Sequence, residues 1–596
     1  MHRVGRAALT AALAITALAA VALTAVNAAP RPPRDRYTMR VEFFEHNLTV
    51  VGHLLLEHVN RHPVEFRQLY FHIYPNAFRA RGAGINVTSV SDDEGPLPYA
   101  IEGVDGTLLR VTLRRPLRPG GALRLRMSFV VKVPRRQDRF GYWGGVLALG
   151  NWYPILAVYD EERGWHLDPY FWHGESFHFY FADYDLWVEV DEGFVLASTG
   201  VLVETRRLGG GRVLMHWVAT NVREVAMAGS RRYRVASTEL WGIKIYSYFL
   251  PEHERQGLFA LEVAKAAIRV YSEHFGRYPY PEFRVCETYG WFGGMEYPMI
   301  IFITSRLYRP SARGSLEIVV AHEVAHQWWY ATLANDEANE PWLDEAFAEY
   351  SQILYVEWVH GRERARSAFD AWIRGPYVRY LSRREDVPAA LSVWNYSSPY
   401  DYYNAVYNKG AYVLHMLRLL MGDEKFFRLL RTWYEKYRFR FARIRDFIRV
   451  AEEVYGGDLS WFFDAWLFSS GVPEYKVLSA EAIPHLSGHV VRVVVAQVGG
   501  GGIRPAAVPV VVATAEGEYE FKVLVNGTGV LRAVVPGLPR WVVVDPAHEV
   551  LRLGNVERAP VTVVAEEAES LLPYALLAAA YAALAAPLAR ALRMRA

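Results

Sequence analysis

The sequence contains a single cysteine among its 596 residues, and neither sign of charge dominates. Cys286 by itself excludes an intramolecular disulfide and a zinc site built from several thiolates. The 66 lysine and arginine residues nearly balance the 64 aspartate and glutamate residues, which gives a formal net charge of +2. A protein that binds nucleic acid through a broad basic surface carries a larger positive excess. We therefore expect no nucleic-acid partner, and any bound metal must use histidine and carboxylate ligands.

Long apolar runs are lacking except at the two ends of the chain. Two arginines precede an apolar run that ends near Ala29, so residues 1–35 are predicted to be a signal peptide or signal anchor with its linker. Residues 571–589 are apolar and long enough to cross a bilayer, which predicts a transmembrane helix over 571–590, and the tail 590–596 is basic. The alternative for this second segment is an alanine-rich helix packed on the protein. The flanking positive charges predict a cell-membrane protein whose other domains lie on the extracytoplasmic side.

The pattern between the ends predicts a multidomain α+β protein, because one hydrophobic core rarely serves a chain of this length. Residues 36–245 show the two-residue alternation of strands, most clearly at 123–129. Helical periods dominate residues 246–473, and strand-like runs separated by glycines return in residues 474–555. We expect an N-terminal β domain, a mostly helical domain, a small β-sandwich and an acidic linker, 556–570, before the C-terminal transmembrane helix.

A metal-binding motif lies in the predicted helical domain. His322, Glu323 and His326 form H-E-x-x-H within a helix predicted over residues 316–333. Histidines four residues apart project from one face of a helix, where both imidazoles can bind one zinc ion. Glu323 lies beside the metal and can remove a proton from a zinc-activated water. Glu345, separated from His326 by eighteen residues, is the candidate third ligand on a second helix, which predicts one Zn²⁺ per chain.

A second carboxylate follows on the helix that carries Glu345. Glu349 lies one turn beyond it and could orient a ligand imidazole through the second ring nitrogen. A surface carboxylate is the alternative for Glu349.

These motifs together resemble the gluzincin aminopeptidases of the aminopeptidase N family, which also includes leukotriene hydrolases. Besides H-E-x-x-H and its gap, Gly-Gly-Met-Glu-Tyr at 293–297 is similar to the family's G-x-M-E-N segment, and Tyr-Asn-Lys-Gly at 407–410 to its Y-x-K-G segment. The resemblance extends from about Tyr37 to Leu553. It implies a saddle-like N-terminal β domain, a thermolysin-like catalytic domain and a β-sandwich.

The resemblance also implies roles for residues outside the metal motif. Tyr407 would donate a hydrogen bond to the oxyanion, and a core aromatic is the alternative. Glu296 would bind the free α-amine of a substrate. The substrate-binding segment comprises Gly293, Gly294, Met295 and Glu296. Tyr297 stands where most relatives have asparagine, and the N-terminal glutamine or glutamate that assists amine binding has no evident counterpart near Trp152.

The sequence therefore predicts a membrane-tethered, extracytoplasmic zinc aminopeptidase that hydrolyses N-terminal residues from peptides. Its partners would be peptides with a free N-terminus and a lipid bilayer. Two other readings stay open: an endopeptidase or epoxide hydrolase on the same scaffold, and a catalytically silent surface binding protein.

Overall fold

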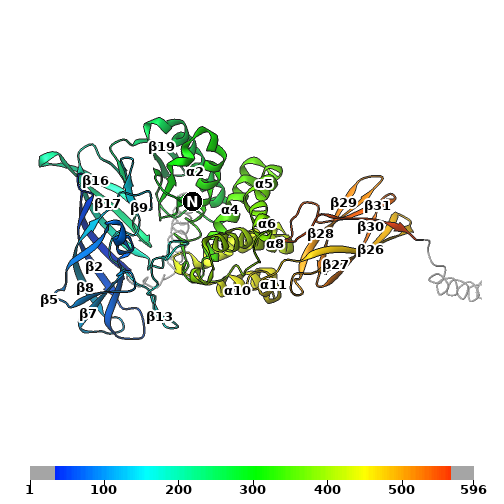
Figure 1. Cartoon of the computed structure of the whole chain (residues 1–596), viewed down its shortest axis with the longest axis horizontal. Helices are drawn as coiled ribbons and strands as arrows, with labels where there is room; N and C mark the ends of the chain where they lie inside the picture. Colours follow the sequence, from blue (N-terminus) through cyan, green and yellow to red (C-terminus); the bar gives the residue numbers. More distant parts are fainter. Residues whose placement is uncertain (1–33, 565–596) are drawn as a thin grey trace, which may run out of the picture.

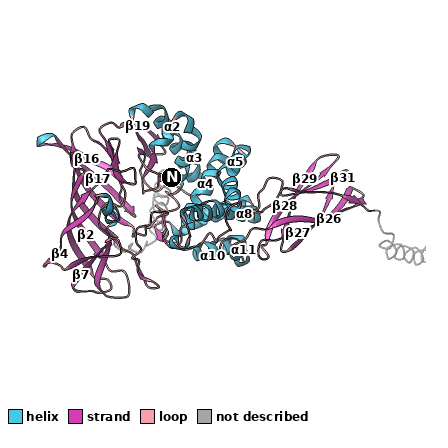
Figure 2. Cartoon of the chain, in the orientation of Figure 1, coloured by secondary structure: helices cyan, strands magenta, loops and turns pink. Residues whose placement is uncertain are grey.

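A computed structural model describes residues 34–564. Three parts follow one another along the long axis of the molecule: a β-rich domain, a mostly helical domain and a β-sandwich (Figure 1). Figure 2 shows that strands dominate the two outer parts and helices the middle one. The predicted order of a β-rich domain followed by a helical domain is confirmed.

The N-terminal domain is built on an eight-stranded sheet in the order β16-β17-β14-β1-β2-β8-β4-β5. Its strands are β1 (Asp35–Phe44), β2 (Thr49–Val59), β4 (Gly84–Asp92), β5 (Gly95–Pro96), β8 (Ala122–Lys132), β14 (Ala182–Asp191), β16 (Val201–Leu208) and β17 (Arg212–Val222). In β8, Leu125, Met127 and Phe129 are buried while Arg124 and Arg126 are exposed. The alternation read from the sequence at 123–129 is thus confirmed.

Smaller sheets complete the N-terminal domain. One contains β9 (Phe140–Trp143), β10 (Val146–Leu149), β15 (Val195–Ser198) and β18 (Met227–Ser230). A second contains β3 (Phe66–His72), β6 (Tyr99–Glu102), β7 (Leu108–Leu117) and β11 (Ile155–Leu156). A short ribbon pairs β12 (Tyr159–Asp160) with β13 (Gly164–Trp165).

The helical domain contains a five-stranded sheet in the order β19-β20-β21-β23-β22. Its strands are β19 (Arg234–Leu240), β20 (Ile243–Phe249), β21 (Glu282–Thr288), β22 (Gly294–Met295) and β23 (Ile300–Thr304). The hairpin β19–β20 begins before the predicted domain boundary at residue 246 and ends just after it. It nevertheless belongs to this sheet, because β20 pairs in parallel with β21.

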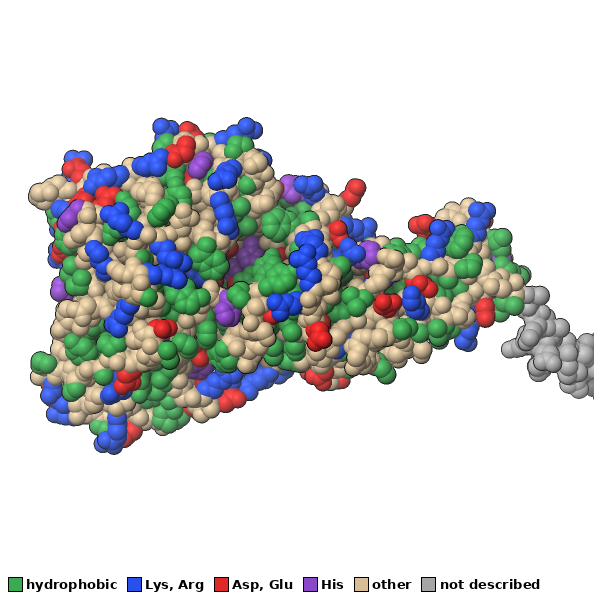
Figure 3. Space-filling model, viewed as in Figure 1, with side chains coloured by type: hydrophobic (Ala, Val, Ile, Leu, Met, Phe, Trp, Pro, Cys, Tyr) green, Lys and Arg blue, Asp and Glu red, His purple; other side chains and the backbone are tan. Residues whose placement is uncertain are grey.

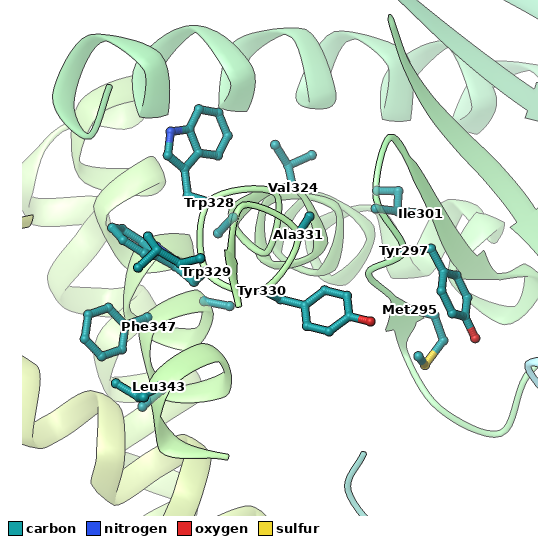
Figure 4. Close-up of a cluster of buried hydrophobic side chains, with 14 of the residues drawn as sticks. Met295, Tyr297, Ile301, Val324, Trp328, Trp329, Tyr330, Ala331, Leu343 and Phe347 are labelled. Atoms are coloured by element: carbon teal, nitrogen blue, oxygen red, sulfur yellow. The ribbon is translucent and has the colours of Figure 1, made fainter. Parts of the chain in front are cut away.

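Helices form the rest of the middle domain. They are α2 (Glu254–His274), α3 (Arg313–Ala325), α4 (Trp342–His360), α5 (Arg362–Phe369), α6 (Gly375–Leu381), α7 (Pro399–Tyr402), α8 (Gly410–Met421), α9 (Asp423–Tyr437), α10 (Ile444–Tyr455) and α11 (Ser460–Trp466). Two π-helical turns, η6 (Asp370–Arg374) and η8 (Tyr403–Lys409), interrupt them. The pair β24 (Leu333–Ala334) and β25 (Arg440–Phe441) links the loop after α3 to the segment before α10. Buried aromatic rings, including Trp328, Trp329 and Phe347, form the core around α3 and α4 (Figure 4).

The β-sandwich consists of two four-stranded sheets, β30-β27-β26-β33 and β29-β28-β31-β32. The strands are β26 (Glu474–His485), β27 (Gly488–Val498), β28 (Ala506–Thr514), β29 (Glu518–Val525), β30 (Thr528–Val535), β31 (Pro539–Val544), β32 (Glu557–Pro560) and β33 (Thr562–Val563). The last two strands fall in residues 556–570, which the sequence analysis treats as a linker. They pair with the edge strands β31 and β26, so the sandwich extends further than expected.

The predicted N-terminal signal segment and the C-terminal helix, 571–590, lie outside the described residues. Among residues 34–564, no helix combines the length and hydropathy needed to cross a lipid bilayer.

Candidate metal centre and active site

Helix α3 carries the metal-binding motif at its C-terminal end. His322 and Glu323 lie in its last turn, and His326 follows directly, with its backbone N–H 3.4 Å from the His322 carbonyl. The helix predicted over 316–333 therefore ends early. The next two backbone N–H groups bond to carbonyls only three residues back, and Tyr330 has a φ of 139°, which a helix does not accommodate. The helical spacing still covers both histidines.

Three side-chain atoms converge on one point between α3 and α4. The Nε2 atoms of His322 and His326 lie 3.2 Å apart, and Glu345 Oε2 lies 3.4 Å from the first and 3.3 Å from the second. A tetrahedral zinc site with bonds of about 2.0–2.1 Å places its ligand atoms about 3.3–3.4 Å apart. These atoms thus form one face of such a tetrahedron, and its fourth corner is left for water or substrate. The donor set and its spacing fit zinc.

Each ligand imidazole is oriented through its other nitrogen. His326 Nδ1 lies 3.0 Å from the Trp329 carbonyl oxygen, and His322 Nδ1 lies 3.4 Å from Glu349 Oε2. A proton on each Nδ1 leaves the Nε2 lone pair directed to the metal position. Glu349 is buried and receives a hydrogen bond of 2.6 Å from Gln352. The structure therefore places Glu349 beside a ligand histidine and away from solvent.

Glu323 is buried next to the ligands and is held by a close glycine contact. Its Oε2 atom has no hydrogen-bond partner among the described residues, and burial raises the pKa of this carboxyl to about 7. A Cβ atom at Gly294 would lie 2.3 Å from Glu323 Oε1. Glycine is therefore required at 294 to leave room for the glutamate. Gly293 has no such contact, since a Cβ there would meet only Val319 at 3.5 Å.

Glu296 is a buried carboxylate near the metal ligands. It is 4% exposed, and its Oε1 atom has no hydrogen-bond partner in the described part of the chain. One of its oxygens lies within 4.8 Å of oxygens from both Glu175 and Glu345. Burial, together with the neighbouring carboxylates, raises the pKa of Glu296 well above its usual value. This arrangement is suited to a cation brought by a ligand.

The structure adds Glu175 and Arg139 to the site, and neither residue is predicted from the sequence. Glu175 lies in the loop before β14 and is ion-paired with the buried guanidinium of Arg139. It occupies the position beside Glu296 that was sought near Trp152, which instead lies in the core and donates to a backbone carbonyl. The available signal was weak: Gly174-Glu175 interrupts an aromatic stretch, residues 170–181, that follows no strand or helix period.

Tyr407 reaches the site from the π-helical turn η8. Its hydroxyl donates a hydrogen bond to Glu345 Oε1, the oxygen that does not face the histidines. Its ring lies parallel to that of His322, with centroids 6.1 Å apart. π-Helical turns are frequent at functional sites because they redirect one side chain without ending the helix.

The cavity that joins these residues has a volume of about 540 Å³ and opens between the β-rich and helical domains. The face shown in Figure 3 is hollowed at this junction, where histidine lies among hydrophobic side chains. Aromatic residues line much of the wall: Trp172, Trp291, Phe292, Trp372, Tyr402 and Tyr403. Of the predicted substrate-binding segment, Gly293, Gly294 and Glu296 line the cavity.

Met295 and Tyr297 point elsewhere. Both side chains belong to the buried hydrophobic cluster of Figure 4, and the Tyr297 hydroxyl donates to Asn151 at 3.3 Å. Met295 was expected to bind substrate, but its side chain does not reach the cavity. Alternate residues of the edge strand β22 face opposite sides of the sheet, and Met295 faces away from the cavity. Tyr297 packs against the N-terminal domain and leaves the cavity beside Glu296 open.

Comparisons with known proteins agree with this geometry. Residues 259–466 match the family described as "Peptidase family M1 domain". The chain is 29% identical over 240 residues to aminopeptidase N of Lactococcus lactis subsp. lactis, and this alignment covers 38% of this chain and 27% of that protein. It is 26% identical over 256 residues to aminopeptidase M1-C of Oryza sativa subsp. japonica (40% and 28%). It is 25% identical over 283 residues to endoplasmic reticulum aminopeptidase 2 of Bos taurus (44% and 29%).

The matching region spans less than a third of the length of each of these three relatives. The family match, residues 259–466, contains the whole ligand set, His322, His326 and Glu345, together with Glu323, Glu296 and Tyr407. Together with the ligand geometry, this match identifies zinc as the cofactor.

Proposed function

We propose that this chain, which carries a peptidase family M1 domain and through it belongs to the gluzincin aminopeptidase N family, is a zinc aminopeptidase. The observation that carries the proposal is the buried carboxylate of Glu296, whose Oε1 atom has no hydrogen-bond partner among the described residues and which lies beside the metal ligands. A metal centre alone would suit any metallopeptidase. A buried anion that awaits a cation selects the charged end of a peptide.

Zinc held by His322, His326 and Glu345 would supply Lewis acidity toward a peptide carbonyl and would lower the pKa of the attacking water. Glu323 then accepts the proton of the attacking water and returns it to the leaving amine. Its close approach to Gly294 positions it, and its Oε2 atom, which has no hydrogen-bond partner in the described part of the chain, is available for that proton. The Tyr407 hydroxyl donates a hydrogen bond to Glu345 in the free enzyme. During the reaction it would instead donate to the peptide carbonyl oxygen as that atom gains negative charge.

Glu296 and Glu175 would together fix the α-ammonium group of the substrate. Their oxygens lie within 4.8 Å of each other, close enough for one ammonium group to bond to both. Because Arg139 already neutralises part of the charge of Glu175, the ammonium group would pair mainly with Glu296. A peptide with a blocked amine would leave this carboxylate desolvated and unpaired. Selectivity for a free N-terminus follows from that cost.

We also propose that the enzyme acts on the extracytoplasmic side of the cell membrane, tethered by residues 571–590. The support is the apolar, uncharged composition of residues 571–589 and the arginines that follow, beginning with Arg590. The β-sandwich precedes the segment and would hold the cavity away from the bilayer.

The test is a substrate panel with and without a chelator. The full-length protein is incubated with aminoacyl fluorogenic amides and with matched peptides whose N-terminus is free or acetylated. We expect cleavage of the amides and free peptides one residue at a time, loss of activity with chelator, and recovery with Zn²⁺. Internal cleavage of acetylated peptides at the same rate as free ones would instead establish an endopeptidase.

A further inference from the structure

A second group of metal-type ligands lies outside the active site, where the β-rich domain meets the helical domain. His166 directly follows β13, His178 lies in the loop before β14, and Asp336 lies in the loop between β24 and α4. Figure 1 labels β13 on the side of the N-terminal domain that faces the helical part. All three residues are buried, and one ligand atom from each lies within 4.8 Å of the others.

Both imidazoles have their second nitrogen occupied in the way that metal ligands require. His166 Nε2 lies 2.5 Å from Asp160 Oδ2, which leaves Nδ1 toward Asp336 Oδ2 at 3.1 Å. His178 Nδ1 lies 3.1 Å from the Asn335 carbonyl oxygen, which leaves Nε2 with its lone pair free. A ring nitrogen that donates to a carboxylate or carbonyl fixes the tautomer that presents the other nitrogen to a metal. His326 in the active site is held by a backbone carbonyl in the same way.

Asp336 is also held in place as a ligand. The backbone N–H of Asn339 bonds to its Oδ1 at 3.2 Å, and the Asn339 side chain bonds to its Oδ2 at 2.7 Å. These contacts fix the carboxylate and still leave lone pairs on Oδ2, the oxygen nearest His166. The 3.1 Å separation from His166 Nδ1 is close to the ligand spacing of a tetrahedral site.

The cavity beside the three residues can receive an ion and its water. It has a volume of about 240 Å³. Four carboxylates and two guanidinium groups line it: Asp160, Glu161, Asp336, Glu340, Arg163 and Arg443. Arg163 lies 3.6 Å from Asp336 Oδ2, and Arg443 lies 3.1 Å from Asp160 Oδ2, so each arginine offsets one carboxylate. Glu161 and Glu340 remain, and their charge favours a bound cation.

We propose that His166, His178 and Asp336 bind a second zinc ion, which joins the N-terminal domain to the loop that leads into α4. Two imidazoles and one carboxylate suit zinc among the common divalent metals. The ion would connect two loops of the N-terminal domain, which carry His166 and His178, to the loop that contains Asp336 and leads into α4, the helix of Glu345. Its role would be to fix the position of α4 relative to the β-rich domain, independently of the peptidase reaction.

The test is the zinc content of the full-length protein after dialysis against metal-free buffer, measured by mass spectrometry. We expect two zinc ions per chain in the unaltered protein and one in each of Asp336→Asn, His178→Ala and His326→Ala. The double variant His326→Ala with Asp336→Asn should hold none. Asp336→Asn keeps the shape of the side chain, so its loss of zinc reports on the ligand.

His62→Ala is the matched control, because His62 lines the same cavity and bonds to the Tyr180 hydroxyl instead of to the ligand group. It should keep two zinc ions. A single ion in the unaltered protein that His326→Ala removes completely would overturn the proposal, as would two ions in Asp336→Asn. His166 would then be an imidazolium held between Asp160 and Asp336. Because the unaltered protein is itself counted, the test does not depend on how well a variant folds.

Discussion

Gly293 and Gly294 are neighbours in the sequence, but only at Gly294 is there too little space for a side chain. A Cβ atom at Gly294 would lie 2.3 Å from the Glu323 carboxylate, whereas a Cβ at Gly293 would meet Val319 at an ordinary 3.5 Å. Gly294→Ala should displace Glu323 and lower kcat on the order of 10²-fold, with zinc content unchanged. Gly293→Ala should stay within about twofold. Equal rates for the two variants, measured with one aminoacyl amide, would show that the close contact does not matter.

Glu323 itself can be tested without disturbing the ligands. Glu323→Gln keeps His322, His326 and Glu345, so zinc should remain bound, but the amide cannot accept a proton. Turnover should fall by at least about 10²-fold, the usual consequence of losing a general base. His326→Ala should lose zinc from this site as well. The role of Glu323 is refuted if the zinc-loaded glutamine variant turns over at a near-normal rate.

Glu296 separates an aminopeptidase from other metallopeptidases. Glu296→Ala should lower kcat/KM for free-amine substrates by a factor on the order of 10² or more, because a buried charge loses its partner. Glu296→Gln keeps the volume but not the charge and should show most of that loss. Zinc content should not change in either variant. Acetylated peptides should be poor substrates for the unaltered enzyme, and the alanine variant should discriminate less between the acetylated and free forms.

The site residues that lie close together in the sequence could be predicted from it. His322 and His326 are one helical turn apart, and Glu345 lies on the next helix, so spacing alone was informative. Glu175 was out of reach because it comes from a loop more than a hundred residues away, and only the tertiary fold brings it to Glu296. Met295 was misplaced because its strand, β22, is too short to show a period.

At the scale of elements, η8 is what aims Tyr407 at the metal ligands. The turn ends at Lys409, whose buried ammonium group bonds to Asp386 and to the carbonyl oxygens of Val387 and Ser469. Lys409→Met should therefore destabilise the protein by about 3–5 kcal/mol, since it leaves a buried carboxylate with fewer partners. It should also lower kcat through the displaced Tyr407.

The control for Lys409 is Lys436→Ala, which removes a largely exposed ion pair with Glu453. Its melting temperature should hardly change, because exposed pairs contribute little. Melting curves of the two variants provide the measurement. A melting temperature for Lys409→Met as high as that of the control would mean that other contacts hold η8.

The ends of elements were predicted less well than their existence. Helix α4 carries Glu345 as expected, whereas α3 ends at Ala325 because the chain turns to bring Tyr330 beside Glu224 and Arg223 of the N-terminal domain. Such a turn depends on contacts distant in sequence. Apolar periodicity continues through it and predicts a longer helix.

At the scale of the whole molecule, the order of the domains could be predicted from the change between the two-residue period of strands and the longer period of helices. The residues at which each domain begins and ends could not. Strands β19 and β20 join the middle sheet although they begin before its predicted start at residue 246. Strands β32 and β33 complete the sandwich although both follow its predicted end at residue 555. Strand partners are chosen by sheet edges that a sequence pattern does not reveal. The cavity at the metal ligands is nevertheless lined mostly by residues 291–407 of the middle domain, with Arg139 and residues 172–175 added from the N-terminal domain.

The proposed membrane tether can be separated from the enzyme, because the described domains end before it. The last strand, β33, ends at Val563, so a chain that stops after Glu569 keeps every described element of the sandwich and of the active site. We expect this shortened protein to be as active as the full-length form and, where the N-terminal segment is cleaved, to be released in soluble form. The full-length protein should stay with the membrane after carbonate extraction. Amide hydrolysis in the membrane and soluble fractions measures both effects, with Glu323→Gln as the inactive control. Carbonate release of the full-length protein, with its N-terminal segment shown to be cleaved, would mean that residues 571–590 do not span the bilayer.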